Sequence, residues 1–282
     1  MTKPLVVKPV TELRRIVGQW KRDGHSVAMV PTMGALHDGH ISLVELALKT
    51  ADRCVVSIFV NPKQFAPTED LDKYPRQLQS DLDRLAQAGA HLAYTPGGED
   101  MYPAGFDLKV SVGGPSQGLE TDFRPQFFDG VATVVAKLFL QATPDFAIFG
   151  EKDYQQLCVV KKLCRDLDIP VEIIGAPTVR DSEGLAMSSR NAYLSATELD
   201  IARQLNRIMR RTGAALRDGA EEAATLSQGI DQILAAGFRK VDYLAVRESG
   251  TLMPWTPGKP GRMLAAAWLG TTRLIDNMEI RY

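Results

Sequence analysis

Short continuous runs of hydrophobic residues alternate with amphipathic segments over the first two thirds of the chain. A continuous run of this kind is typical of a strand that is buried on both faces of a parallel sheet. The intervening segments place apolar residues three or four positions apart, which indicates helices with one buried face. The repeated strand–helix order predicts an α/β fold with a doubly wound parallel sheet. Strands of this sheet are predicted at 27–30, 54–60, 91–94, 145–149 and 171–175, with one more at 108–112 in the loop-rich stretch 96–128.

The pattern changes after Pro177. Two amphipathic helices are predicted there, at 196–212 and 220–236. Helices followed by strands are typical of an α+β fold. We therefore predict a doubly wound domain over 1–176 and a smaller α+β domain over 177–282. The strands of the second domain are predicted at 241–246, 262–268 and 272–280.

The stretch Pro31–His40, PTMGALHDGH, joins the first predicted strand to a helix. Its glycines, Gly34 and Gly39, permit a tight turn. A turn at the carboxyl end of a parallel strand is where open α/β sheets bind ligands. The N–H groups and the dipole at the start of the helix favour an anion there. Because His37 and His40 add two imidazoles at the same place, the H-x-G-H sequence predicts an anion-binding site.

Two other interpretations of this turn are open. In the first, the histidines only cap the helix that follows. In the second, they share a metal ion. The metal interpretation is weaker, because no third ligand stands nearby in the sequence and the H-E-x-x-H spacing is absent.

Composition narrows the classes of function. The net charge of −1 and the pI of about 6.4 argue against a broad surface for nucleic acid or membranes. No apolar run approaches the length of a membrane span, and the first ten residues lack the apolar core of a signal peptide. Cys54, Cys158 and Cys164 show neither metal nor disulfide spacing, so we expect core thiols in a reducing compartment.

Four stretches carry a resemblance to a known family: PTMGALHDGH, FVNPKQF at 59–65, FGEKDYQQL at 149–157 and MSSRN at 187–191. In this order and spacing, the chain resembles the pantothenate synthetases, or pantoate–β-alanine ligases, of the H-x-G-H nucleotidyltransferase superfamily. The resemblance also includes Tyr74–Arg76 and Arg273–Asn277. It implies a Rossmann-like first domain that binds nucleotide and pantoate, and a second domain that closes over the ATP site.

The family reaction has two half-reactions. The carboxylate of pantoate attacks the α-phosphate of ATP, and the amine of β-alanine then displaces AMP from the pantoyl adenylate. Neither step needs a covalent enzyme nucleophile, so catalysis rests on positioning and on charge stabilisation. The resemblance implies ATP, pantoate and β-alanine as substrates, Mg²⁺ with the ATP, and a cytoplasmic homodimer that binds neither nucleic acid nor membranes.

The same resemblance assigns residues. It implies that His40, His37 and Lys152 are catalytic, through hydrogen bonds and charge directed at phosphate oxygens. Gln64 and Gln156 match glutamines that bind pantoate or β-alanine. A neutral amide suits pantoate, because it bonds hydroxyls and the carboxylate without neutralising the nucleophile. The implied ATP-binding residues are Met33, Gly34, His37, His40, Gly150, Glu151, Lys152, Asp153, Val179, Met187, Ser188, Ser189 and Arg190.

Several of these positions also have an ordinary interpretation. Without its motif, Gln64 would be a solvated loop residue and Ser188–Arg190 an ordinary loop. Lys152 would be an exposed lysine at a helix start, paired to Asp153. Asp81 matches an acidic position near Mg²⁺ in the family, but the bare pattern favours an exposed helix aspartate.

One stretch departs from the family pattern. Where the family often has R-P-x-H-F-x-G-V, this chain has Phe127 in place of the histidine, within Arg124–Val131. Any polar contact of that histidine with substrate is absent here.

Three alternative functions are a nucleotidyltransferase with a phosphate acceptor, a tRNA synthetase, and a nucleotide-binding protein without catalysis.

Overall fold

The structure is a computed structural model that describes residues 3–65, 71–72 and 74–281. The chain forms two compact units. The first comprises Met1–Glu151 and Val159–Pro177, and the second comprises Lys152–Cys158 and Thr178–Tyr282. The sequence pattern alone did not separate Lys152–Cys158 from the first unit.

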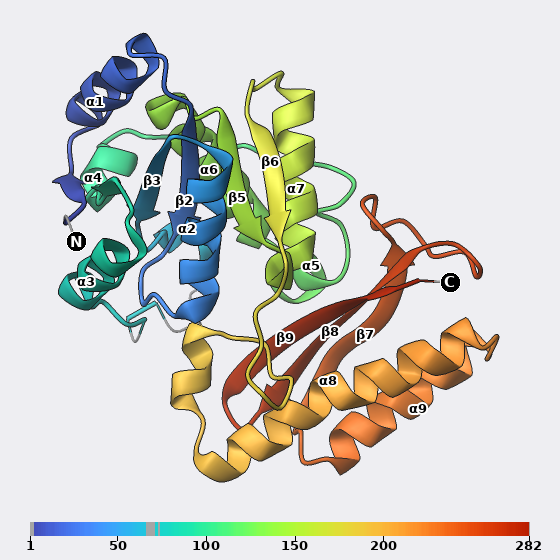
Figure 1. Cartoon of the computed structure of the whole chain (residues 1–282). Coiled ribbons are helices and arrows are strands. Elements are labelled where there is room, and N and C mark those ends of the chain that lie inside the picture. The colour runs from blue at the N-terminus through green and yellow to red at the C-terminus, as the bar shows by residue number, and fades with distance from the viewer. Residues whose placement is uncertain (1–2, 66–70, 73, 282) are drawn as a thin grey trace. The chain divides into compact units, whose positions relative to one another are not determined.

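A six-stranded sheet forms the centre of the first unit (Figure 1). Its strand order is β1-β4-β3-β2-β5-β6, and every neighbouring pair runs parallel. The predicted doubly wound α/β fold is thereby confirmed. The strands are β1 (Leu5–Val7), β2 (Val27–Thr32), β3 (Arg53–Ile58), β4 (Leu92–Tyr94), β5 (Phe146–Gly150) and β6 (Glu172–Ala176).

Helices alternate with these strands and bury their apolar faces on the sheet. Helices α2 and α3 pack on each other, as do α1 and α6. Right-handed crossovers place the two pairs on opposite faces of a parallel sheet. Ala28, Val30 and Val44 belong to the core on the α2 face. The helices are α1 (Val10–Arg22), α2 (Asp38–Thr50), α3 (Leu78–Ala88), α4 (Gly98–Met101), α5 (Glu120–Phe123), α6 (Phe127–Ala142) and α7 (Tyr154–Asp166), with short 3₁₀ turns η1 (Pro62–Gln64) and η2 (Glu151–Asp153).

The strand order creates a switch point between β2 and β5. From β2, the chain moves through β3 to β4 in one direction, whereas β5 lies on the other side of β2 and leads to β6. Ligands of open α/β sheets bind outside the carboxyl ends of the strands at such a point, where consecutive loops diverge. The loops that follow β2, β3 and β5 therefore lie where a ligand site of the first unit is expected.

One sequence-based prediction about this unit is wrong, and one strand was not predicted. Residues 108–112 form no strand, because the N–H of Val110 bonds the hydroxyl of Thr133 instead of a neighbouring strand, at 3.0 Å. Conversely, Leu5–Val7 forms strand β1, which pairs with β4. Three residues are too few for a recognisable hydrophobic pattern, so only the pairing with β4 identifies this strand.

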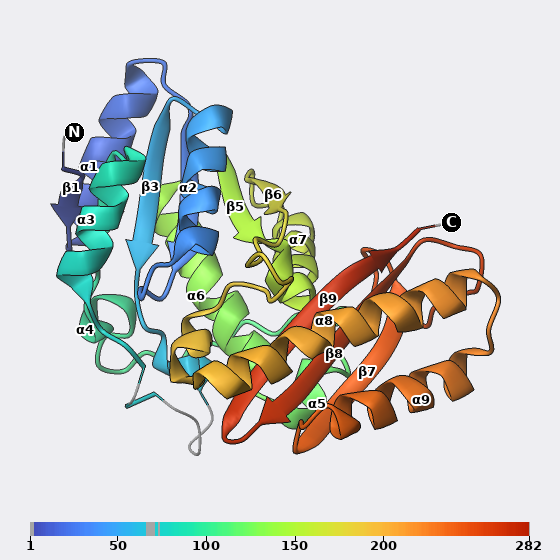
Figure 2. The same ribbon diagram turned by 60° about the horizontal axis from the view of Figure 1, so that its bottom comes forward.

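The second unit contains an antiparallel sheet of order β7-β8-β9, with α8 and α9 packed together along one face (Figure 2). Met263, Ala265 and Leu205 belong to the core between the sheet and the helices. This arrangement confirms the predicted small α+β unit. Helix α8 is longer than the predicted 196–212. The elements are η3 (Ser189–Tyr193), α8 (Ala196–Arg217), α9 (Glu222–Ala235), β7 (Lys240–Glu248), β8 (Gly261–Leu269) and β9 (Thr272–Ile280).

The three cysteines agree with a further expectation. All three thiols are free and buried, as predicted for core residues. Burial raises the pKa of the Cys54 thiol to about 12, so this thiol stays protonated and unreactive at neutral pH. None of the described helices is both long and apolar enough to cross a membrane.

A histidine is built into the first unit near the amino ends of its strands. The Nδ1 atom of His91 accepts a hydrogen bond from the N–H of Cys54 at 3.1 Å, and its ring contacts the edge of Trp20. Burial lowers the pKa of His91, and the nearby Arg53 and His25 lower it further. The folded state therefore prefers the neutral imidazole, whose Nδ1 can accept.

We predict a pH dependence of stability from this histidine. Because its pKa is lower in the folded than in the unfolded state, its contribution is present above the ordinary histidine pKa and is lost as the pH falls through the folded value. His91→Asn keeps an acceptor for Cys54 but does not titrate. Between about pH 7.5 and about pH 5.5, the wild type should lose more unfolding free energy than His91→Asn in urea titrations. Equal losses in the two proteins would contradict the prediction.

Candidate functional site

The turn between β2 and α2 places both histidines at the start of α2. His37 is the N-cap residue, and its Nδ1 accepts from the N–H of Gly39 at 3.2 Å. The Nδ1 of His40 accepts from the N–H of His37 at 3.3 Å. The two rings lie 4.1 Å apart between centroids. Because both Nδ1 atoms accept, the neutral rings carry their protons on Nε2. The histidines therefore do cap the helix, as that interpretation expects, and capping through Nδ1 is compatible with anion binding through two Nε2–H donors.

The same turn contains two consecutive left-handed residues. Gly34 has φ +83°, and Ala35 has φ +50°, which is unfavourable for a residue with a side chain. A Cβ at position 34 would lie 3.0 Å from Asp81 Oδ2 and 3.1 Å from Ile58. Thr32 holds the start of the turn, since its hydroxyl donates to the carbonyl of Ser57 and accepts from the N–H of Gly34.

Asp81 stabilises this strained backbone from helix α3. Its Oδ2 accepts from the N–H of Ala35 at 3.0 Å, and its Oδ1 accepts from the N–H of Leu36 at 2.8 Å. The side chain is buried, so the interpretation of an exposed helix aspartate is wrong. Burial raises the pKa of Asp81, while the two N–H donors and Arg84 oppose that rise. Both oxygens are engaged by backbone, so the geometry gives Asp81 a role in holding the turn and adds no support to its predicted place beside Mg²⁺.

The loop after β3 holds Gln64 in a defined orientation. Asn61 is buried, and its Oδ1 accepts from the Tyr102 hydroxyl at 2.8 Å and from the N–H of Lys63. The amide group of Asn61 must then donate, and it does so to Gln64 Oε1 at 2.9 Å and to the carbonyl of Gly130 at 3.1 Å. Because its Oε1 accepts from Asn61, Gln64 presents its amide nitrogen as a donor. The side chain is buried, so the solvated interpretation is wrong.

Helix α6 packs unusually close to this loop. A Cβ at Gly130 would lie 2.2 Å from the carbonyl oxygen of Lys63, so only glycine fits there. Arg124 donates to the carbonyl of Gln64 at 3.1 Å, and its guanidinium lies 3.8 Å from the ring centroid of Phe127. Phe127, the departure from the family pattern, thus packs against an arginine that holds the Gln64 backbone.

The third loop begins at the end of β5, next to β2 in the sheet. Gly150 is the last residue of β5, and Glu151 is the last residue of the first unit before the chain enters the second unit at Lys152. In the second unit, the carbonyl of Lys152 accepts from Asn277 at 2.7 Å. Within the described part of the chain, Lys152 forms no ion pair with Asp153, contrary to its ordinary interpretation.

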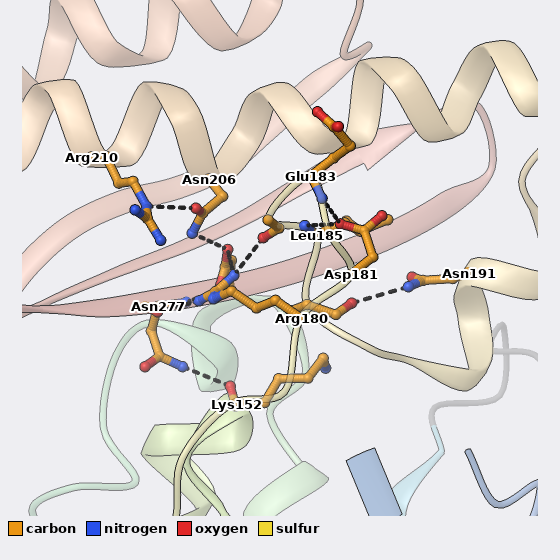
Figure 3. A network of polar contacts seen from close by, with 12 residues as sticks. Lys152, Arg180, Asp181, Glu183, Leu185, Asn191, Asn206, Arg210 and Asn277 are labelled. Carbon is orange, nitrogen blue, oxygen red and sulfur yellow. Dashed lines mark hydrogen bonds and ion pairs between the residues drawn. The ribbon is translucent and has the colours of Figure 1, made fainter. Parts of the chain in front are cut away.

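The remaining predicted residues lie in the second unit, in a hairpin over residues 178–191. Val179 and Met187 are paired, since the N–H of Met187 donates to the carbonyl of Val179 at 2.9 Å. Arg180 and Ala186 form a β-bridge one step further along. Ser188 caps the turn Ser189–Tyr193 by accepting from the N–H of Arg190, which leaves the Ser188 hydroxyl proton as a donor. Figure 3 shows the polar contacts around this hairpin.

The structure groups the predicted residues by unit. In the first, the segments at the carboxyl ends of β2, β3 and β5 carry seven of them: Met33, Gly34, His37, His40, Gln64, Gly150 and Glu151. In the second, Lys152, Asp153 and Gln156 share one short segment, and Val179, Met187, Ser188, Ser189 and Arg190 share the hairpin.

The sequence alone did not identify the residues whose hydrogen bonds hold the predicted site residues in place. Asn61, Tyr102 and Arg124 support Gln64, and Arg180 and the pair Asp276–Asn277 support the hairpin. Asn61 precedes a proline, which signals a turn but not a support role. The others are separated from their partners by more than 35 residues, so no local pattern could reveal them.

The possible metal ligands of the described residues bear on the zinc interpretation. They contain no group of three or more histidine, cysteine, aspartate or glutamate residues arranged to hold a metal ion. A zinc site at His37 and His40 is therefore not supported. Mg²⁺ commonly binds through one or two carboxylates together with substrate phosphates, so it would accompany ATP as part of the substrate.

Comparisons with known proteins agree on one family. The sequence pattern of Pantoate-beta-alanine ligase matches residues 5–279. The pantothenate synthetase of Mesorhizobium japonicum is 65% identical over 280 residues, which cover 99% of both chains. A solved pantothenate synthetase of Thermus thermophilus is 45% identical, with a TM-score of 0.90 and coverage of 99% and 100%. The Pantoate-beta-alanine ligase of Francisella tularensis, solved with Beta-gamma ATP and Beta-alanine, is 34% identical, with a TM-score of 0.82 and coverage of 98% and 97%.

We predict that Asp81→Asn destabilises the first unit. An amide can accept at only one of its two positions, so one N–H of the turn at Ala35 or Leu36 would face an NH₂ group. The expected loss is about 1–3 kcal/mol of unfolding free energy. Asp83→Asn is the matched control, because Asp83 is exposed on the same helix, where its carboxylate accepts from Gln79. Similar midpoints for the two variants in denaturant titrations would refute the role of Asp81.

Proposed function

The chain belongs to the pantoate-beta-alanine ligase family, and from this premise we propose how its residues carry out the family reaction. The protein is an ATP-dependent ligase that joins pantoate to β-alanine, with AMP and pyrophosphate as the other products. The observation that carries our assignment of residues is the pair of Nε2–H donors of His37 and His40 at the start of α2, beside the switch point of the sheet.

The first half-reaction forms pantoyl adenylate. A carboxylate oxygen of pantoate attacks the α-phosphorus of ATP, and the bond to the bridging oxygen of pyrophosphate breaks. Negative charge grows on the non-bridging α-phosphate oxygens as this happens. His40 and His37 stabilise that charge through their Nε2–H groups, assisted by the N-terminus of α2, and Lys152 contributes a positive charge. The donors are held by backbone contacts of Nδ1 and need little reorganisation.

Other residues hold the departing pyrophosphate and the adenine. We assign Ser188, Ser189 and Arg190 to the β- and γ-phosphates, because a guanidinium and two hydroxyls suit phosphate oxygens. Val179 contacts adenine through its backbone, next to Met187. Gly34, Gly150, Met33, Glu151 and Asp153 complete the proposed ATP site. Mg²⁺ enters with ATP as the Mg–ATP complex.

The second half-reaction uses the same pantoyl group. The amine of β-alanine attacks the acyl carbon, AMP leaves with the bonding electrons, and the amine loses a proton. Gln64 and Gln156 hold the pantoyl group throughout. The fixed orientation of Gln64, which presents its amide nitrogen as a donor, supports a bond to a hydroxyl or carboxylate oxygen of pantoate. The side chain of Gln156 has no hydrogen bond within the described residues, which leaves its amide available to substrate.

Three finer assignments rest on the family resemblance. The chain forms a homodimer, it acts in the cytoplasm, and it uses Mg²⁺ with ATP.

The rival functions differ in the acceptor. A nucleotidyltransferase for a phosphate acceptor would need cations to bind that phosphate, whereas we assign the acceptor to Gln64, whose buried side chain presents a neutral amide.

The test of this function is the exchange of labelled pyrophosphate into ATP. Exchange should require pantoate but not β-alanine, because the carboxylate of pantoate is the nucleophile of the first half-reaction. His40→Ala should slow exchange roughly a hundredfold or more, as expected for the loss of one preorganised donor to a developing oxyanion. ATP binding measured by calorimetry should change much less.

Three outcomes would contradict these assignments. A requirement for β-alanine in the exchange would exclude a separate adenylate step. ADP and phosphate as products would indicate an acyl phosphate in place of an adenylate. Exchange by His40→Ala at the rate of the wild type would remove His40 from the catalytic residues.

A second prediction concerns the orientation of Gln64. Tyr102→Phe removes one of the two donors to Asn61 Oδ1 and leaves only the N–H of Lys63, so the Asn61 amide and Gln64 are held less firmly. The KM for pantoate should rise about 2–10-fold, which corresponds to about 0.5–1.5 kcal/mol, while the KM for ATP stays unchanged. Burial raises the pKa of Tyr102 to about 12, so the hydroxyl remains a donor at the assay pH.

Tyr94→Phe provides the matched control. Tyr94 is a buried tyrosine of the same unit, and its hydroxyl donates to Gln141 at 3.0 Å rather than to Asn61 or Gln64. It should leave both KM values near those of the wild type. An equal rise in the KM for pantoate in both variants would show that loss of any buried hydroxyl suffices.

A further inference from the structure

Two adjacent residues of β9, Asp276 and Asn277, support separate parts of the proposed ATP site. Both side chains are buried, with 5% and 4% of their surface exposed. Asp276 contacts Arg180 of the hairpin over 178–191. Asn277 contacts Lys152 (Figure 3). Neither residue belongs to the nucleotide-binding residues proposed above.

Asp276 fixes the hairpin through Arg180. The guanidinium of Arg180 bonds both carboxylate oxygens of Asp276, at 2.7 Å each, in a bidentate pair. The same guanidinium donates to the carbonyls of Gly184 and Asn277, at 3.0 and 3.1 Å. Arg180 thus joins its own side of the hairpin and the turn at Gly184 to β9. Because Val179 precedes Arg180 directly, its backbone position depends on this ion pair.

The remaining acceptor sites of Asp276 are also occupied. Asn206 of α8 donates to Oδ2 at 3.0 Å, and the N–H of Asn277 donates to Oδ1 at 2.7 Å. Asn206 is itself held by Arg210, which donates to its Oδ1 at 2.9 Å. A buried carboxylate with four donors has one favoured orientation, so Arg180 is held in one place.

Asn277 fixes the backbone of Lys152. Its Nδ2 donates to the carbonyl of Lys152 at 2.7 Å, and its Oδ1 accepts from Arg262 Nε at 2.8 Å. The Arg262 contact determines which end of the amide faces Lys152. The pairing of β9 with β8 continues past both residues without a shift in register. The two supports therefore stand on a regular, hydrogen-bonded strand.

We propose that Asp276 and Asn277 are positioning residues, which together set the place of Lys152 and of the hairpin that carries Val179 and Arg190. This inference rests on the proposed function of those residues in binding ATP. A buried ion pair is weak evidence for stability, since its desolvation offsets much of its attraction. Its geometric effect is strong, because a bidentate pair permits one arrangement of the two side chains. The adenylate step, which needs Lys152 and the hairpin at once, depends on that arrangement.

The chain offers a matched control for this proposal. Asp242 of β7 accepts from Arg273 of β9 at 2.7 Å, and also from Trp268. This ion pair is as buried as the pair of Asp276 with Arg180 and lies in the same sheet. Its partners belong to β7, β8 and β9 rather than to the hairpin or to the segment of Lys152. Asp242→Asn therefore measures the effect of losing a buried ion pair while the contacts that hold the hairpin and Lys152 stay in place.

The experiment compares Asp276→Asn with Asp242→Asn in the full chain. Thermal midpoints, the KM for ATP in pantoate-dependent pyrophosphate exchange, and hydrogen exchange of the 178–191 amides are measured for both. We expect similar losses in midpoint. Asp276→Asn should raise the KM for ATP roughly tenfold or more and accelerate amide exchange at Met187. Asp242→Asn should change neither. Equal changes in both variants, or an unchanged KM for ATP in Asp276→Asn, would overturn the proposal.

Asn277→Asp tests the second support separately. Aspartate still accepts from Arg262 but cannot donate to the carbonyl of Lys152. The turnover number for pyrophosphate exchange should fall at least tenfold, while amide exchange in the hairpin stays as in the wild type. Wild-type turnover would overturn the role of Asn277. The amide-exchange measurements need no catalysis, so they test the support by Asp276 even if the wild type fails to exchange pyrophosphate and the proposed function is wrong.

Discussion

A carboxylate from another helix stabilises the strained turn between β2 and α2. Two consecutive residues there have positive φ, and the second is an alanine, which disfavours that conformation. Asp81 accepts hydrogen bonds from Ala35 and Leu36 and so holds the strained backbone. The conformation places His37 at the N-cap of α2, with His40 one turn later. The orientation of both imidazoles, and hence the catalysis we propose, follows from that interaction.

The other loops follow the same rule, in which a buried polar side chain from a distant element fixes a loop that carries a functional residue. Asn61 and Tyr102 orient the amide of Gln64. Asp276 holds the hairpin through Arg180, and Asn277 holds the backbone of Lys152. Such buried polar groups contribute little net stability, because their desolvation offsets their hydrogen bonds. Their effect is precision, which a reaction catalysed by positioning needs more than stability.

Glycine and an aromatic ring complete the support around Gln64. Gly130 allows α6 to approach the carbonyl of Lys63 more closely than any side chain would permit. Phe127 stacks on Arg124, which bonds the carbonyl of Gln64. Phe127 therefore has a structural role in this chain, because its ring lies against the arginine that bonds the carbonyl of Gln64.

The sequence by itself determined the fold class, the order of most elements and the identity of the candidate residues. Buried parallel strands produce long apolar runs, and loops that bind phosphate need glycine and particular side chains close together, so both signals are local. The sequence did not determine strand β1, the absence of a strand at 108–112, or the burial of Asp81. Tertiary structure decided these, because each depends on a partner distant in sequence: β4 for β1, Thr133 for Val110, and the turn at Ala35 for Asp81. The supports Asn61, Arg180 and Asp276 became visible for the same reason, since a hydrogen bond between distant residues leaves no periodic pattern in the chain.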